Sequence, residues 1–274
     1  MSQNRQVTGG RRKLTAEQEP FLVARALSTT YSHRYVIRPH THAAHQLLFA
    51  ASGAMTVTGD RATWMIPPGR AVLIPAGVWH SIRMWGDVAM RSLYFPPGAM
   101  AHQGGPEGPQ LPTVFDACRV ISVSPLLREL ILRVAALAAL DSRDESDARL
   151  MGVLMDELAI ANVEPLRLPL PSDARALAAG HDILANPGAD ATTDDVARRA
   201  GLSPRTLERL FRAETGMTFG LWRQKARLLE SVRVLAEGKS VTDAALESGY
   251  SSVSAYIVAF KQTFGCTPGA LANS

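Results

Sequence analysis

Short apolar runs dominate residues 21–95, and glycine, proline and aspartate separate them. The runs read QLLFAA, MTVTG, RAVLIPA and SIRMW. Gly59-Asp60 is typical of a hairpin turn, and Pro67-Pro68-Gly69 of a loop. Short and closely spaced strands predict a β-sandwich or a small β-barrel. Residues 96–112 are rich in proline and glycine and are expected to form a surface loop.

The pattern becomes helical after residue 112. Ser124 is the predicted N-cap of a helix with Pro125 at its first position. The segment that follows, LLRELILRVAALAAL, carries apolar residues at helical spacing, and a second amphipathic helix is expected at about 146–162. This helical hairpin either completes the first domain or presents an apolar seam to a second copy of the chain.

A linker, LRLPLP at 166–171, precedes a part that is helical throughout. Within residues 192–216, Thr193 is the predicted cap of a short helix, and Gly201 supplies the turn that ends it. Ser203 and Pro204 then begin a second helix. The buried stripe of this second helix holds Leu207, Leu210 and Phe211. The opposite side of the same helix carries Arg205, Glu208, Arg209 and Arg212. Two short helices joined by a glycine turn predict a helix-turn-helix unit.

The same arrangement recurs in residues 240–265. Ser240 caps the first helix, Gly249 makes the turn, and Ser252 caps the second helix. The core stripe of that second helix is Tyr256, Phe260 and Phe264. Residues 219–238 between the two units predict one amphipathic helix. At about 1.5 Å per residue it spans roughly 28 Å, close to the ~34 Å of one DNA turn.

Composition and charge narrow the function classes. Of 274 residues, 46% are apolar, and no uninterrupted apolar stretch predicts a membrane span. Residues 1–20 lack the apolar core of a secretory signal, and Cys118 and Cys266 fit no metal spacing, so we expect a cytoplasmic protein with reduced thiols. The formal net charge is +4, and residues 198–233 hold nine basic and three acidic side chains. This local excess favours an anionic partner such as DNA.

Residues 172–271 resemble the DNA-binding domain of the AraC/XylS family of bacterial regulators. The matching elements are AxxxGxSxxxLxRxFxxxxG in the first unit, the helix RLLESVRVL, and AxxSGYSSxSAYxxxFKxxFGxTP at 245–268. The resemblance implies that the second helix of each unit reads DNA. In the first unit the implied DNA-contacting residues are Arg205, Thr206, Glu208, Arg209 and Arg212. An arginine can bind guanine O6 and N7 with two hydrogen bonds.

In the second unit the implied reading helix runs from Ser252 to Gln262. Its side chains toward the bases would be Val253, Ser254, Ile257 and Val258. Apolar side chains can contact a thymine methyl group but donate no hydrogen bond, so we expect weaker base discrimination here. Ser251, Ser252 and Lys261 are expected to hold phosphates.

The N-terminal part contains a second set of candidate residues. On an uninterrupted strand, His40, His42 and Gln46 would share one face, because side chains alternate. The later segment GRAVLIPAGVWH ends at His80. Together these segments resemble the two motifs of the cupin superfamily, H-x-H-x3-E-x6-G and G-x5-P-x-G-x2-H. Gln46 stands where glutamate is usual, and Arg34 where a glycine is usual.

The cupin resemblance implies a divalent metal held by His40, His42, Gln46 and His80. Three imidazoles and one amide oxygen suit Ni, Zn, Fe or Cu without choosing between them. An amide oxygen is, however, a poorer ligand than a carboxylate. The alternative is a metal-free pocket in which the same side chains bind a small-molecule effector or hydrogen-bond each other.

The expected fold class is α+β multidomain, with a cupin-like β-barrel and a helical hairpin before an all-α domain of two helix-turn-helix units. The expected parts are a flexible basic tail at 1–18, an effector-binding barrel at 19–112, the hairpin at 113–165, a linker at 166–172 and an AraC-type DNA-binding domain at 173–274.

These features predict a sequence-specific transcription regulator, not an enzyme, whose DNA binding or promoter activity responds to a small effector or metal in the barrel. The expected partners are double-stranded DNA, the effector, a second copy of the chain through residues 124–162 and, for an activator, RNA polymerase. One alternative is a metal-dependent cupin enzyme with a helical appendage, which Gln46 disfavours. Another is an architectural DNA-binding protein, which leaves the histidine pocket without a role.

Overall fold

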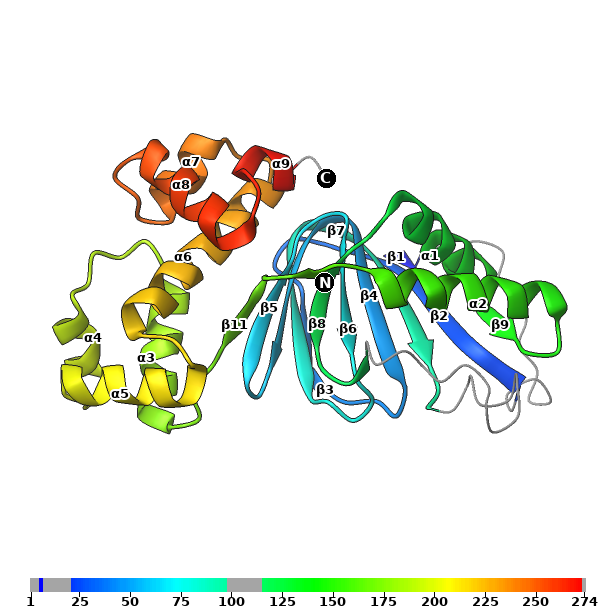
Figure 1. Cartoon of the computed structure of the whole chain (residues 1–274), viewed down its shortest axis with the longest axis horizontal. Helices are drawn as coiled ribbons and strands as arrows, with labels where there is room; N and C mark the ends of the chain where they lie inside the picture. Colours follow the sequence, from blue (N-terminus) through cyan, green and yellow to red (C-terminus); the bar gives the residue numbers. More distant parts are fainter. Residues whose placement is uncertain (1–4, 7–20, 98–114, 273–274) are drawn as a thin grey trace. The chain divides into compact units, whose positions relative to one another are not determined.

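The structure is a computed structural model that describes residues 5–6, 21–97 and 115–272 (Figure 1). Its internal contacts divide the chain into two compact units. The first unit joins the chain up to Thr56 with Pro68–Glu164, and the second joins Val57–Pro67 with the chain from Pro165 onward. Each unit is therefore built from two separate stretches of sequence.

Antiparallel strands form most of the first unit. The long strands are β2 (Leu22–Tyr31), β4 (His45–Gly59, as far as Thr56 in this unit) and β7 (His80–Phe95). β7 pairs with β2 and with β3 (Val36–His40). β4 pairs with β6 (Arg70–Ile74), which pairs with β8 (Arg119–Ser122). The short strands β9 (Ala139–Asp141) and β10 (Val163–Glu164) join β2 and β8.

The two faces of this sheet carry different side chains. On one face, Leu47, Phe49, Leu93 and Phe95 belong to a buried apolar cluster shared with α1 (Pro125–Leu137) and α2 (Glu145–Ile160). Their sequence neighbours Gln46 and Tyr94 point to the other face, where they hydrogen-bond each other at 2.9 Å. The helices thus cover the apolar face, and the opposite face keeps a polar set.

Both predicted helices of this unit are present. Ser124 caps α1 by accepting a hydrogen bond from the Leu127 amide, and Pro125 is its first residue, as predicted. α2 begins at Glu145 because Asp144 caps it, slightly before the predicted start.

Two predicted irregular segments contain strands instead. Inside the predicted flexible tail, β1 (Arg5–Gln6) pairs with Thr29 and Thr30 of β2. Inside the predicted linker, β11 (Arg167–Pro169) pairs with β5 (Ala62–Ile66) in the second unit. A strand this short, with prolines around it, has no periodicity that a sequence pattern can detect. The rest of the tail and residues 98–112 of the predicted loop lie outside the described residues.

Helices form the rest of the second unit. In chain order these are α3 (Ala174–Ala185), α4 (Thr193–Arg199), α5 (Pro204–Thr215), α6 (Phe219–Ala236), α7 (Val241–Glu247), α8 (Val253–Phe264) and α9 (Pro268–Ala272). The pairs α4–α5 and α7–α8 are the two predicted short helix pairs, and α6 is the predicted helix between them. In the part of the chain that the structure describes, no helix is long and apolar enough to cross a membrane.

The two helix pairs repeat the same local chemistry. Gly201 and Gly249 make the turns with positive φ angles of 67° and 76°, which glycine adopts without steric cost. Ser203 and Ser252 cap the second helices. The predicted cap Thr193 is wrong by one residue, because Thr192 is the cap and exchanges hydrogen bonds with Asp195. Asp195 is the acid three residues after Thr192 that such a capping box needs, whereas Thr193 has Val196 there.

Each helix pair packs on its own end of α6. Near the start of α6, Phe211 of α5 lies edge-on to Phe219 and Trp222, with ring centroids at 4.9 and 5.1 Å. Near its end, the buried Tyr256 hydroxyl of α8 donates to Ser231 Oγ at 3.0 Å. The Trp222 indole donates to the Pro169 carbonyl at 2.6 Å, which fixes β11 to the same helix.

Candidate functional site

The α5 helix separates a buried apolar side from an exposed basic side. Leu207, Leu210 and Phe211 are buried, as predicted from their spacing. Arg205, Arg209 and Arg212 are exposed on the other side. The structure thus brings the three predicted arginines to one surface of one helix.

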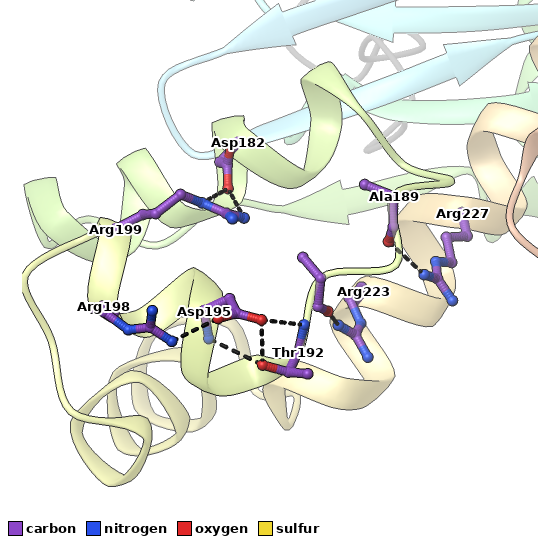
Figure 2. A network of polar contacts seen from close by, with 9 residues as sticks. Asp182, Ala189, Thr192, Asp195, Arg198, Arg199, Arg223 and Arg227 are labelled. Atoms are coloured by element: carbon purple, nitrogen blue, oxygen red, sulfur yellow. Dashed lines mark hydrogen bonds and ion pairs between the residues drawn. The ribbon is translucent and has the colours of Figure 1, made fainter.

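The arginines of the second unit divide by their partners. Arg198 binds Asp195 and Arg199 binds Asp182, each with a nitrogen–oxygen distance of 2.6 Å (Figure 2). Arg233 binds Glu230 at 2.6 Å. Arg205, Arg209 and Arg212 form no ion pair or side-chain hydrogen bond with any residue that the structure describes. Their guanidinium groups are therefore available to an external anion.

Two other predicted α5 residues have partners within the protein. The Glu208 carboxylate accepts a hydrogen bond from the Phe219 amide at 3.0 Å, at the first residue of α6. A carboxylate is favoured there because the amide dipoles at a helix start point toward it. Thr206 Oγ1 lies 2.8 Å from Ser203 Oγ. Both side chains therefore have structural contacts that the sequence pattern did not indicate.

The α8 helix presents a less basic surface. Ser251, Ser252, Ser254 and Lys261 are exposed, whereas Val253 and Ile257 are partly buried. Val258 is 56% exposed, on the same side as Ser254 and Lys261 because they lie four and three positions away. Gln262 is also exposed at this surface and was missing from the predicted contact residues, although it ends the predicted reading helix.

Three predicted histidines of the first unit come together. His40 ends β3, His42 follows in the β3–β4 connection, and His80 begins β7. One ring nitrogen from each lies within 4.8 Å of the others. The predicted uninterrupted strand through Gln46 is wrong, because β3 ends at His40 and β4 begins at His45. The loop, rather than strand alternation, turns His42 toward the other two.

The backbone fixes one nitrogen of each of these rings. Nδ1 lies 2.9 Å from Arg38 O in His40, 2.6 Å from Ala44 O in His42, and 3.0 Å from Val78 O in His80. A neutral imidazole that donates from Nδ1 keeps a lone pair on Nε2, and metal-binding histidines are commonly oriented in this way. Nε2 of His80 is buried and has no hydrogen-bond partner among the described residues. The Nε2 atom of His80 is therefore open to a metal or to a hydrogen-bond donor on an effector.

Gln46 completes this histidine site. Its amide nitrogen donates to the Tyr94 hydroxyl at 2.9 Å, which directs the amide oxygen to Nε2 of His42 at 2.8 Å. Each ring nitrogen of His42 therefore lies next to an acceptor oxygen. A neutral imidazole, however, has only one N–H and can donate to only one of them. A cation between Nε2 and the amide oxygen would remove this conflict, as would a second proton on the imidazole or a Gln46 amide turned by about 180°. The donor set thus fits a divalent transition metal.

The protonation state of His80 also suits a ligand. Burial, with a smaller contribution from the nearby His40 and His42, lowers the pKa of His80 to about 4 despite the opposing effect of the hydrogen bond to Val78. His80 is therefore neutral at pH 7, as a metal ligand must be. His45 lies apart from the cluster and contacts the Phe115 ring at 5.0 Å between centroids.

Comparisons with known proteins match both parts of the chain. Residues 22–158 match the AraC-like ligand binding domain, and residues 196–274 match a helix-turn-helix domain. The HTH-type transcriptional regulator NimR of Escherichia coli K12 is 34% identical over 230 residues, which cover 84% of this chain and 80% of NimR. The transcriptional activator NphR of Rhodococcus sp is 42% identical over 82 residues, or 30% of this chain and 24% of NphR.

A solved structure also matches part of the chain. It is an AraC-type transcriptional regulator from Chromobacterium violaceum, 28% identical, with 37% of this chain and 92% of that chain covered and a TM-score of 0.36.

The NimR alignment spans the ligand-binding and the helix-turn-helix parts together. The related proteins are transcription regulators, so the similarity supports a regulator and not the cupin enzyme. The chain belongs to the AraC family of DNA-binding transcription regulators, with an AraC-like ligand-binding domain followed by a helix-turn-helix domain.

Proposed function

We propose that this regulator reads double-stranded DNA with two helix-turn-helix units, α4–α5 and α7–α8, and that the histidine site in a cupin-like barrel controls this binding. The α5 and α8 helices are the reading helices. α6 has 18 residues and so a length of about 27 Å, which suits two contacts in successive major grooves roughly 34 Å apart.

The observation that carries the DNA proposal is that some arginines of the second unit have partners within the protein and others have none among the described residues. Arginines with a structural role in this unit are paired with carboxylates or carbonyls, whereas Arg205, Arg209 and Arg212 are exposed without such partners among the described residues. Exposed guanidinium groups on one helix can bind phosphates and guanine edges. We assign base contacts to Arg205 and Arg209. Glu208 and Thr206 then support the helix through Phe219 and Ser203.

The second unit contributes less base discrimination in this proposal. The exposed side chains of α8 are small, apolar or amide groups, and Lys261 is its one exposed basic residue within the described helix. Ser254 and Val258 would contact bases, while Ser251, Ser252 and Lys261 would hold phosphates. The selected DNA site should accordingly have one strongly and one weakly specified block.

A matched pair of variants tests the DNA surface. Replacing Arg205, Arg209 and Arg212 together by alanine should abolish specific binding and make affinity less dependent on salt, because about three phosphate or base contacts are lost. Replacing the paired Arg198 by alanine should leave both quantities near those of the wild type. Fluorescence anisotropy with labelled duplex at several salt concentrations measures both. Equal losses in the two variants would contradict the proposal.

The effector site is proposed at His40, His42, Gln46 and His80. A divalent metal would supply a fixed cation in the barrel, held by the three Nε2 atoms and the amide oxygen of Gln46. The supporting observations are the three Nδ1 atoms fixed by carbonyls and the two acceptors that face His42. A small-molecule effector that donates hydrogen bonds to the same nitrogens is the second possibility.

Metal analysis distinguishes these two occupants. Chain purified without a histidine tag should contain about one equivalent of Ni, Zn, Fe or Cu, and the double variant His42→Ala, His80→Ala should contain none. The variant should keep a folded second unit, because that unit is unchanged, but its DNA binding should no longer respond to added metal. Metal-free wild-type protein that takes up no added metal would leave the small-molecule effector as the occupant.

A further inference from the structure

The connection between α3 and α4, residues 186–191, contacts both helix pairs of the DNA-binding unit. It leads directly into α4 of the first pair. It also meets the second pair at the end of α7. A side-chain carbon added at Gly188 would lie 2.5 Å from the Glu247 carbonyl oxygen, closer than such atoms approach. The two backbones are therefore in direct contact at this point.

The second backbone in this contact is the turn of the second helix pair. Gly249 has a φ of 76°, and a side-chain carbon added there would lie 3.1 Å from both Cα and O of Gly188. Two glycines thus face each other, one from residues 186–191 and one from the α7–α8 turn. Any larger residue at either position would push the two segments apart.

Two arginines of α6 hold the other side of this connection. Arg227 Nε donates to Pro187 O at 2.8 Å and its Nη2 to Ala189 O at 3.1 Å. Arg223, one helical turn earlier, donates to Ala191 O at 2.7 Å. Figure 2 shows Arg223 and Arg227 side by side on α6, both turned to these residues. Alternate carbonyls therefore face α6, and Gly188 between them faces the second helix pair.

Arg227 lies at the centre of this arrangement. A side-chain carbon at Gly249 would lie 3.4 Å from Arg227 Cζ, so the guanidinium group sits against the turn as well as against the connection. Burial lowers the pKa of Arg223, and the charge of Arg227 lowers it further, while Asp190 opposes both effects. The cost of placing two cations together is offset by three carbonyl acceptors. Two neighbouring cations repel each other, so we interpret this pair as fixing the geometry of residues 186–191 rather than as adding positive charge.

We propose that residues 186–191, held by Arg227, fix the spacing and angle between the two reading helices, so that Arg227 is a positioning residue for two-groove DNA recognition. This inference rests on the proposed reading by two helix-turn-helix units. Phe211 and Glu208 hold the first pair to the start of α6, and Tyr256 holds the second pair nearer its end. A third tie between the pairs makes the domain rigid.

Rigidity matters because the DNA double helix sets both the distance and the rotation between two contact blocks. A change of one base pair between two contact blocks moves the second block by roughly 3.4 Å and rotates it by about 35°. A rigid protein loses the second contact at the wrong spacing, and a flexible one adapts at an entropic cost. The connection should therefore determine how strictly this regulator selects the distance between the blocks.

The test uses the full chain and a duplex site that it has selected from random DNA. The spacing between the two blocks is varied from two base pairs shorter to two longer, and affinity is measured by anisotropy. The wild type should prefer its own spacing over a change of one base pair by about tenfold or more. Arg227→Met should reduce this preference to about threefold or less while leaving affinity for a duplex with the first block alone unchanged.

Two further variants separate positioning from charge. Arg227→Lys keeps the positive charge but cannot bond two carbonyls, so it should also relax the spacing preference. Arg199→Met is the control, because Arg199 binds Asp182 and does not contact residues 186–191. This variant should behave as the wild type. Gly188→Ala should relax or shift the preferred spacing. If this variant fails to keep its helical circular dichroism, the Arg227 variants decide the question.

Two results would overturn the inference in distinguishable ways. If Arg227→Met and Arg227→Lys keep the full spacing preference, then residues 186–191 do not set the spacing. A uniform loss at all spacings in Arg227→Met alone would make Arg227 a phosphate contact. If the wild type shows a single block or no spacing preference, reading by two units fails, and the inference fails with it.

Discussion

In the DNA-binding unit, the partners of single arginine side chains separate those that stabilise the fold from those that are available to bind DNA. Arginine is frequent there, and its number alone does not separate structural from functional residues. The partners do separate them, because Arg199 has Asp182, Arg227 has two carbonyls, and Arg209 has neither among the described residues. A guanidinium group without a partner inside its own domain is the better candidate for a base edge.

Arg209 should therefore specify one base pair. Arg209→Ala is expected to weaken binding to the selected site by roughly 1–3 kcal/mol and to relax selection at a single position. Affinities for the selected duplex and its point variants, measured in parallel, give both numbers. If cognate and random duplexes lose the same affinity, Arg209 contacts a phosphate instead.

His80 should make the stability of the protein depend on pH. Its pKa is about 4 in the folded protein because of burial, and about 6.5 in the unfolded chain, so the unfolded chain binds more protons between these values. Stability should then fall as the pH drops from 7 to 5, by about 2 kcal/mol for this residue. Urea unfolding of metal-free wild type and of His80→Gln at both pH values measures the difference. The same pH dependence in both proteins would show that His80 is not the cause.

At the scale of elements, the sequence was most informative where local chemistry decides the structure. The helix starts at Pro125, Pro204 and Val253 follow from serine caps that lie directly before them. Strand β11 and the fixed connection at 186–191 could not be predicted, because their partners are distant in sequence and their own residues have no periodic pattern. The clustering of His40, His42 and His80 was expected from the cupin motifs, but the loop that turns His42 inward was not.

The cap of α4 gives a test at this scale. Thr192→Ala should lower the free energy of unfolding of the second unit by about 1 kcal/mol, because it removes the capping box with Asp195. Thr193→Ala, the neighbouring change with the same loss of atoms, should have little effect. Denaturant unfolding of both variants checks this. A larger loss in Thr193→Ala would return the helix start to the predicted position.

At the scale of the whole molecule, two units are each assembled from two stretches of the chain. The segment Val57–Pro67 continues β4, the strand of Gln46, and belongs by its contacts to the DNA-binding unit. Gln46 and the start of this segment therefore lie on one continuous strand. A division of the sequence into consecutive domains could not reveal that Val57–Pro67 belongs with the second unit.

Self-association is expected through the helices of the first unit. Val153 and Ile160 lie seven positions apart on α2, hence on one side, and are 44% and 75% exposed. Exposed apolar groups on one helix face favour a second copy of the chain. Val153→Glu with Ile160→Glu should shift sedimentation from dimer toward monomer. A wild-type chain that is monomeric at micromolar concentration would contradict this expectation.

The most direct test of the central claim is a selection of random duplex DNA by the full chain, read by sequencing at a fixed salt concentration. The proposed function predicts a motif of two blocks about one helical turn apart, roughly 10 base pairs, with the block under α5 more strongly specified than the block under α8. Recovery of a single block, or of no motif from protein that is fully folded, would contradict reading by two helix-turn-helix units.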